Sequence, residues 1–239
     1  MSRHAVLNPD EHADLRVRAE ASAELGDAVM SSFTVPIEFR RIQHNFPILF
    51  RRDLETGKFS ALALLGFESG ENLFLDGGRW DADYKPLALA IQPFLVGRSA
   101  GGDGLSQVHI DLDHPRVASD GEGVALFDAL RRPTPYVERI SEMLAELDEG
   151  YRASGSFFAA LERYELLEPF ALDVELGDGS KHRMVGYHLI NEEKLRELEP
   201  GAIAELHAEG HLMPIFMALA SLSNLPNLIA RKDRRNGHG

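Results

Sequence analysis

The sequence predicts an α+β fold in which a mainly antiparallel sheet with hairpins comes first, followed by helices and a second hairpin in one compact unit. Three observations predict it: short β-prone apolar runs separated by glycine turns in the first half, helical apolar spacing from Thr134 onward, and an alternating segment between the helices. No Pro- or Ser-rich linker divides the chain. We therefore expect a single domain over 1–239, with a β-rich part at about 30–130, a helix-rich part at about 134–230 and a disordered basic tail at 231–239.

The β-rich part begins with a predicted hairpin. Apolar runs at 46–50 and 59–67 flank Glu55-Thr56-Gly57-Lys58, which places a glycine at the turn. Further short strands are predicted at 72–75, 91–96 and 108–112.

The helix-rich part begins at Thr134, whose hydroxyl can cap a helix that has Pro135 in its first turn. A second helix is predicted after Ser156, and Asn191 is a plausible start for another. The remaining elements are a hairpin at 170–176 and 184–190, and helices at 202–209 and 212–222.

Composition restricts the partners of this chain. The formal net charge of −13 opposes a broad phosphate-binding surface, so nucleic acid is not an expected partner. There are no cysteines, which excludes disulfides and thiolate metal sites and fits a reducing compartment. No continuous apolar run reaches 18 residues and the N-terminus lacks a secretory pattern, so we expect no membrane span and a cytoplasmic location.

An ordered series of short motifs runs along most of the chain. In order, these are Val35-Pro36 with Glu38-Phe39, Phe46-Pro47-Ile48-Leu49-Phe50, Ala63-Leu64-Leu65-Gly66, Glu71-Asn72-Leu73-Phe74, Trp80 with Tyr84 and Pro86, Pro93-Phe94, Leu126-Phe127, Gly186, Leu195, Gly210-His211-Leu212 and Ser221-Leu222. In order and spacing this series resembles the SapC-like family of bacterial proteins. The chain departs from the family pattern at Ala90-Ile91-Gln92, where Arg-Arg-Tyr is common, and at Ala218, where a histidine is common.

The resemblance implies a general biological role for the protein but no specific chemical reaction. Members of this family have no settled biochemical activity, and in aquatic bacteria they accompany TonB-dependent outer-membrane receptors, flavin halogenase-like proteins and cupin-like proteins. This implies an accessory role in uptake or in peptide modification. A peptide-transporter permease of similar name needs several membrane spans, which this sequence does not predict.

Glu71, Asn72, Trp80 and Tyr84 form the candidate binding site. They combine polar groups with large aromatic rings in what reads as a glycine-rounded surface loop, a mixture suited to a peptide or protein contact. The alternative is that Trp80 and Tyr84 anchor an irregular loop in the core while Asn72 closes a turn.

His109 and Asp111 raise a second functional hypothesis. On a strand they would point to one face, and with a distant histidine they would match the ligand pattern of iron or zinc enzymes. The candidates for that third ligand are His182, His188, His207 and His211. The simpler interpretation is a capped turn before Pro115 with solvent-facing side chains, so no metal or other cofactor is predicted.

Two predicted helices carry large apolar side chains that fit either a core or a contact surface. One carries Phe157, Phe158 and Tyr164, and the other Met213, Phe216 and Met217. Their helical spacing favours a buried core, whereas a ligand groove or a homodimer seam would require them to be exposed.

The usual catalytic signatures are missing. The sequence has no nucleotide-binding glycine motif, no phosphate-binding loop, no serine-hydrolase elbow and no His-Glu-x-x-His. We therefore expect a non-catalytic accessory protein that binds a protein or peptide partner, with the metal-dependent enzyme or enzyme subunit as the alternative. A surface-layer component is disfavoured by the lack of a secretory pattern.

Overall fold

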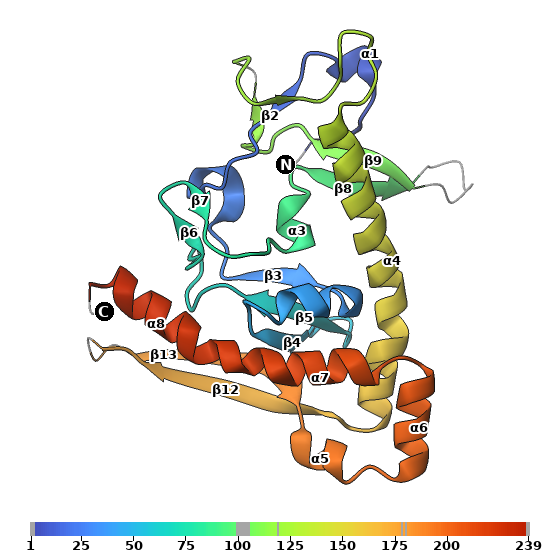
Figure 1. Ribbon diagram of the computed structural model, residues 1–239, viewed down its shortest axis with the longest axis vertical. Coiled ribbons are helices and arrows are strands. Elements are labelled where there is room, and N and C mark those ends of the chain that lie inside the picture. The colour runs from blue at the N-terminus through green and yellow to red at the C-terminus, as the bar shows by residue number, and fades with distance from the viewer. Residues whose placement is uncertain (1–2, 99–105, 119, 178, 180, 238–239) are drawn as a thin grey trace. The chain divides into compact units, whose positions relative to one another are not determined.

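The computed structural model describes residues 3–98, 106–118, 120–177, 179 and 181–237 (Figure 1). The chain folds into two compact units, each built from separate segments. Unit 1 comprises Met1–Ala28, Leu75–Asp81 and Leu87–Glu149, and unit 2 comprises Val29–Phe74, Ala82–Pro86 and Gly150–Gly239. The predicted β-rich and helix-rich parts each contribute to both units. The chain is α+β with antiparallel sheets, as predicted, while the single domain stays a prediction.

Unit 1 contains two small antiparallel sheets and a short hairpin. The first sheet has the order β1 (His4–Val6), β9 (Ser106–Asp111), β8 (Phe94–Arg98), and the second the order β10 (Val117–Ala118), β2 (Arg16–Val17), β11 (Val124–Ala125). The hairpin pairs β6 (Leu75–Asp76) with β7 (Arg79–Trp80). The helical segments are α1 (Pro9–His12), η1 (Ala23–Asp27), α3 (Leu87–Ala90) and the first part of α4 (Pro135–Arg163).

The core of unit 1 packs one face of α4 against these sheets. Val137, Ile140 and Leu144 recur at helical spacing and are at most 4% exposed. They belong to the same buried cluster as Val17 and Ile110, each 0% exposed. The amphipathic pattern after Thr134 therefore predicted this helical face correctly.

Unit 2 is organised around one five-stranded antiparallel sheet. Its strand order is β12 (Leu167–Glu175), β13 (Lys181–Ile190), β4 (Ile48–Arg52), β5 (Phe59–Leu64), β3 (Ser31–Thr34). Both predicted hairpins are confirmed, β4 with β5 and β12 with β13. The two hairpins join where His188 of β13 pairs with Phe50 of β4.

Short helices complete unit 2. They are η2 (Pro36–Glu38), α2 (Phe39–Ile42), α5 (Glu192–Arg196), α6 (Pro200–Ala208), α7 (Leu212–Ser221), η3 (Leu222–Asn224) and α8 (Leu225–Arg235). Helix α7 packs against α2 and against strands β4 and β13. The predicted start of a helix at Asn191 is confirmed, because its side chain accepts a hydrogen bond from the backbone N–H of Lys194 at 2.8 Å.

The prediction of two helices between Thr134 and Tyr164 is wrong, because α4 is continuous from Pro135 to Arg163. Ser154 does not interrupt it, since its hydroxyl donates to the carbonyl of Gly150 within the helix at 2.6 Å. Gly150 provides room for a close neighbour: an added Cβ would lie 2.6 Å from Cγ2 of Val35. Ser156, the predicted start of the second helix, also donates within the helix, to the carbonyl of Ala153 at 3.1 Å, so it does not mark a helix end.

The predicted disordered tail is also wrong for Arg231 to Arg235, which form the last turns of α8. Lys232 is 7% exposed, and its ammonium group donates to Glu71 at 2.6 Å and Glu68 at 3.0 Å. Tertiary ion pairs therefore order a segment that its sequence alone reads as a solvated end. Residues 238–239 lie outside the described part of the chain.

Candidate functional site

Glu71 and Asn72, two of the predicted binding residues, are engaged in internal hydrogen bonds of unit 2. The Glu71 carboxylate accepts from the backbone N–H of Phe67 at 2.9 Å as well as from Lys232. Asn72 is 2% exposed; its side-chain oxygen accepts from the N–H of Phe74 at 3.0 Å, and its carbonyl accepts from Arg235 at 3.0 Å. Both residues therefore hold the loop that follows β5.

Tyr84 of unit 2 also makes internal contacts. Its hydroxyl donates to Glu38 at 2.8 Å, and the guanidinium of Arg41 lies 5.1 Å from the centre of its ring. Glu38 is fully buried, and its second carboxylate oxygen accepts from the hydroxyl of Thr34 at 2.7 Å. Trp80, by contrast, belongs to unit 1, where it is half-buried and pairs with Leu75. A partner contact by these four residues stays a prediction.

The His109–Asp111 pair lies on strand β9, two residues apart, as the metal hypothesis requires. The His109 ring covers Gly97, where an added Cβ would lie 2.0 Å from its Nε2 atom. Asp111 accepts from the N–H of Asp113 at 3.1 Å and lies 3.9 Å from His4. Among the described residues, no group of three or more His, Asp or Glu side chains could hold a metal ion, so no third ligand joins the pair.

Helix α7 carries two of the exposed large apolar side chains of unit 2, Met213 and Phe216, next to each other. Its sequence, Leu-Met-Pro-Ile-Phe-Met-Ala-Leu-Ala-Ser, is apolar up to the last residue. Gly210 has a φ of 76°, which ends α6 and turns the chain into α7. Pro214 lies in the first turn, where a helix does not need the missing N–H.

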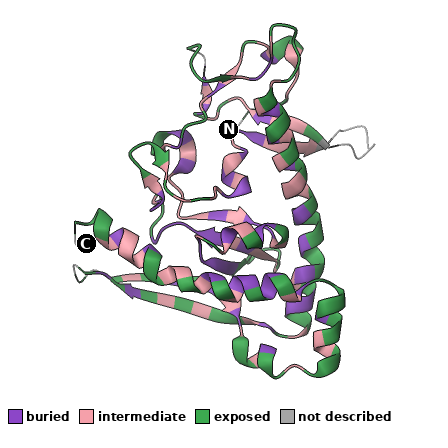
Figure 2. Cartoon of the chain, viewed as in Figure 1, coloured by how far each residue is buried: buried purple, intermediate pink, exposed green. Residues whose placement is uncertain are grey.

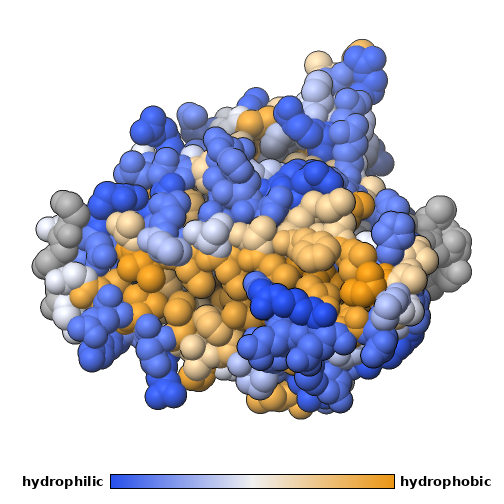
Figure 3. All heavy atoms as spheres, turned by 60° about the horizontal axis from the view of Figure 1, so that its bottom comes forward, coloured by the Kyte–Doolittle hydropathy of each residue, from blue (hydrophilic) through white to orange (hydrophobic). Residues whose placement is uncertain are grey.

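One side of α7 is buried and the other is open (Figure 2). Ile215 and Ala218 are at most 2% exposed, whereas Met213 and Phe216 are 55% and 54% exposed. Because Met213 and Phe216 are three positions apart, they lie next to each other on the outer face. A broad area of apolar side chains is visible in the space-filling view (Figure 3). An exposed apolar area of this kind is typical of a surface that contacts a protein, a ligand or a membrane.

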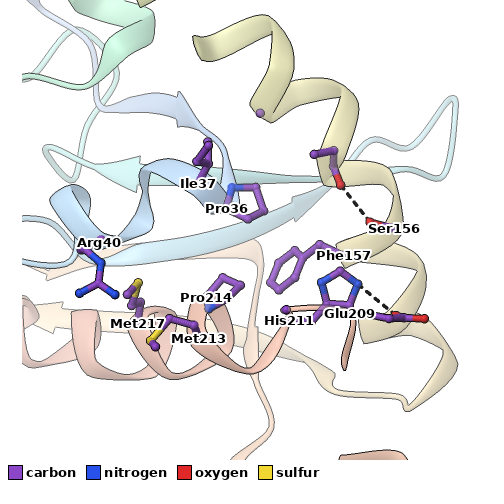
Figure 4. Close-up of a pocket in the computed structure, with 13 residues that line it drawn as sticks. Pro36, Ile37, Arg40, Ser156, Phe157, Glu209, His211, Met213, Pro214 and Met217 are labelled. Carbon is purple, nitrogen blue, oxygen red and sulfur yellow. Dashed lines mark hydrogen bonds and ion pairs between the residues drawn. The ribbon is translucent and has the colours of Figure 1, made fainter. Parts of the chain in front are cut away.

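A pocket of about 350 Å³ lies on one flank of α7, and we call it the Arg40 pocket (Figure 4). Its apolar lining comes from η2, α4 and α7, and includes Pro36, Ile37, Phe157, Met213, Pro214 and Met217. Ile37 is 53% exposed and Phe157 is 1% exposed, so the pocket has a buried floor and an open rim. This volume suits a side chain or a small ligand.

The ionisable side chains of the Arg40 pocket lie at its two ends. Arg40 is at one end, while Glu209 and His211 are at the other (Figure 4). Nε2 of His211 lies 3.2 Å from the Glu209 carboxylate, but without hydrogen-bond geometry, and this buried atom has no other partner among the described residues. The His211 ring packs edge-on against Phe157 at 5.7 Å. The pocket is therefore apolar in its middle and polar at both ends.

A second pocket, the Leu195 pocket, lies on the opposite flank of α7. It has a volume of about 470 Å³ and is lined by Glu192, Leu195, Arg196, Ile203, Leu212, Phe216 and Leu219. Its two charged groups, Glu192 and Arg196, pair with each other one helical turn apart. We call Met213 and Phe216 together with these two pockets the α7 surface.

Comparison with known protein families shows to which family the chain belongs. The sequence model of the SapC family matches residues 7–228 of the 239. The chain belongs to the SapC family. No curated protein and no solved structure matches this SapC-family chain significantly. Of the motifs that carry the resemblance, Pro36, Gly210 and His211 line the Arg40 pocket.

The SapC-family chain also contains a long apolar helical stretch. Leu212–Arg235 is long and apolar enough to cross a membrane, with a mean hydropathy of 1.5 in its 18-residue window, 33% of which is buried. Core helices of soluble proteins meet the same criterion, so the absence of a membrane span stays a prediction.

The apolar sequence of α7 predicts a helix correctly, but the prediction that its large side chains are buried is only partly right. The core interpretation holds for Met217 and Phe157, which are 8% and 1% exposed, and is wrong for Met213 and Phe216. Arg40, Ile37 and Glu209 were missed altogether. A sequence signal for them is lacking, because an isolated charged or aliphatic residue next to a short helix looks like any surface position.

Proposed function

We propose that this SapC-family protein is a non-catalytic accessory protein that binds a peptide segment of a protein partner on the α7 surface. The observation that carries the proposal is the exposure of Met213 and Phe216, more than half of each, between two pockets. Two exposed apolar side chains with a pocket on each side can accommodate the alternating side chains of a bound peptide. Exposed methionine and aromatic side chains are enriched at such contacts.

Charge favours a peptide over a lipid surface as the occupant. The chain carries a net charge of −13, so an extended anionic lipid surface would be repelled by the protein as a whole, whereas a short peptide responds mainly to the side chains that it contacts. The α5–α6 segment next to the Leu195 pocket adds Glu193, Glu197 and Glu199 to this field. The family resemblance, and no feature of the geometry, supports a connection of the partner with TonB-dependent uptake or with peptide modification.

The proposal is tested by selecting peptides from a random library displayed on phage against the full chain. We expect enriched sequences rich in Leu, Ile, Phe or Met, whose binding falls at least about tenfold in Met213→Asp and in Phe216→Asp. Leu54→Asp is the matched control, because Leu54 is 96% exposed on the β4–β5 turn and lies outside both pockets.

Four results would contradict this function. Selection could yield no enriched peptide, or binding could be equally strong in the α7 variants and in the Leu54→Asp control. Sedimentation velocity could instead reveal a dimer that Met213→Asp dissociates, which would assign the surface to a second copy. Co-sedimentation of the protein with phosphatidylcholine–phosphatidylglycerol vesicles, lost in Phe216→Asp, would assign it to a membrane.

A further inference from the structure

The Arg40 pocket and the Leu195 pocket differ in whether their arginine has a carboxylate partner. In the Leu195 pocket, Arg196 is neutralised by Glu192. In the Arg40 pocket, the Arg40 side chain is exposed and makes no hydrogen bond or ion pair within the described part of the chain. An arginine at the rim of an apolar pocket presents up to five donors in a planar fork that matches a carboxylate.

The opposite end of the same pocket disfavours an anion. The carboxylate of Glu209 lies there beside His211 (Figure 4). A ligand carboxylate placed at that end would meet a like charge, whereas at Arg40 it would meet an unpaired cation. The two ends therefore define a direction for any ligand that carries one acidic group.

The apolar middle separates these ends and provides the socket. Ile37 and Met213 form its open rim, and Phe157 forms part of its floor. The apolar surface continues past the pocket to Phe216, so a ligand that occupies the Arg40 pocket alone would leave that area uncovered. This continuity favours an acidic side chain within a longer segment over a terminal carboxylate.

We infer that the α7 surface selects a peptide in which an apolar side chain fills the Arg40 pocket and a neighbouring Asp or Glu side chain pairs with Arg40. This inference rests on the proposed peptide-binding function and names its ligand class. Pairing with Arg40 gives specificity for an acidic residue, while the apolar contacts with Ile37, Met213 and Phe157 provide the larger share of affinity.

The test uses an array of nonapeptides, acetylated and amidated so that the only carboxylate is on a side chain. Each carries one Leu followed, one to four positions later, by Glu, Gln or Lys, and binding of the unlabelled peptides is measured by isothermal titration calorimetry. We expect the best Glu peptide to bind about threefold more tightly than its Gln analogue, as for an ion pair with a solvent-exposed arginine. Arg40→Gln should remove the difference, and Arg40→Glu should shift the preference to Lys.

Arg196→Gln is the matched control, because Arg196 lines the other pocket and already has a carboxylate partner. Thermal unfolding of each variant verifies that the fold is intact. Equal binding of Glu and Gln peptides, still lost in Met213→Asp, would overturn the role of Arg40 and leave the peptide-binding function standing. A second set of the Gln peptides is made with a free C-terminal carboxylate, and tight binding by this set but by no amidated peptide would also overturn the side-chain assignment. No peptide binding above that of Met213→Asp would overturn both proposals.

Discussion

The ammonium group of Lys232 lies 2.6 Å from the carboxylate of Glu71, although 161 positions separate the two residues in the sequence. The Lys232 side chain is 8% exposed and that of Glu71 is 11% exposed, so both charges are largely removed from water. A pair of this kind holds α8 against the loop that follows β5. It also makes Glu71, a predicted binding residue, part of the interior of unit 2.

Replacement of Lys232 by Met should destabilise the protein by about 2–3 kcal/mol, because it leaves the Glu71 carboxylate buried without its cation. Urea unfolding followed by circular dichroism measures this. Lys194→Met is the matched control, since Lys194 and its partner Glu165 are 44% and 76% exposed, and we expect little change there. Equal losses in the two variants would contradict the role of the buried pair.

Replacement of Arg116 by Met should cost about 3 kcal/mol. Its guanidinium pairs with Asp27, with side-chain exposures of 3% and 0%, and donates to the carbonyls of Arg18 at 2.8 Å and Glu20 at 2.9 Å. The loss should be smaller when Asp27→Asn is added, because the buried charge is then removed. Strict additivity in a double-mutant cycle of unfolding free energies would show that the two side chains do not stabilise each other.

Stability should fall as the pH drops below about 6.5 because of His114. Burial and the adjacent Arg116 lower its pKa, against opposing effects of Asp111 and Asp27. Nδ1 accepts from the N–H of Arg116 at 3.2 Å and Nε2 lies 3.2 Å from the Gln92 side-chain oxygen, an arrangement that fits the neutral ring. A histidine with a lowered folded-state pKa contributes stability above its unfolded pKa and loses it as pH falls through the folded pKa.

The check for His114 is the urea midpoint at pH 7.5 and at pH 5.5. The difference between the two should be smaller in His114→Gln than in the unaltered protein. An identical difference would show that other groups, such as His188, whose pKa is also lowered by burial, account for the pH dependence.

Two glycines of α4 should respond to alanine in opposite directions. At Gly150 the added Cβ would lie 2.6 Å and 2.7 Å from Cγ2 atoms of Val35 and Ile37, so Gly150→Ala should cost about 1–3 kcal/mol despite alanine's helix propensity. At Gly155 the added Cβ would have no neighbour within 4 Å apart from the backbone of its own helix, so Gly155→Ala should stabilise by about 0.5–1 kcal/mol. Thermal unfolding of the two variants side by side measures the contrast, and stabilisation by both would contradict the close packing at Gly150.

Substitution of the exposed residues of the α7 surface should leave the fold intact. Phe216→Asp should alter the free energy of unfolding by less than about 1 kcal/mol, because more than half of the side chain is already in water. The same change should reduce binding of the dye 8-anilinonaphthalene-1-sulfonate, which reports exposed apolar surface. Undiminished dye binding would place the accessible apolar surface elsewhere.

Local sequence signals predict the helices and strands of this fold well, but they predict less well which side chains of those elements are packed or paired with distant residues. Alternation and a glycine turn were sufficient for the β4–β5 hairpin, and the Asn191 cap was sufficient for the start of α5. The continuity of α4 was missed because the reason for Gly150 lies in Val35, a residue distant in sequence. The order of α8 was missed for the same kind of reason, since Lys232 needs Glu68 and Glu71.

The candidate site could be predicted only in part. Met213 and Phe216 were recognised as apolar helical residues, but spacing does not reveal which helical face is covered when the whole helix is apolar. Arg40 became informative only when the structure showed that it lies at the pocket and has no partner among the described residues. Both properties depend on tertiary structure.

The order of strands in unit 2 has a consequence for synthesis on the ribosome. Strand β4 receives its second neighbour from β13, whose paired residues Tyr187 and His188 are translated well over a hundred positions after Arg51 and Phe50. Until then the nascent β3–β4–β5 sheet exposes the backbone of β4 as an open edge next to apolar side chains. Such an edge can pair with the edge of another nascent chain. We therefore expect this protein to need chaperones during its synthesis.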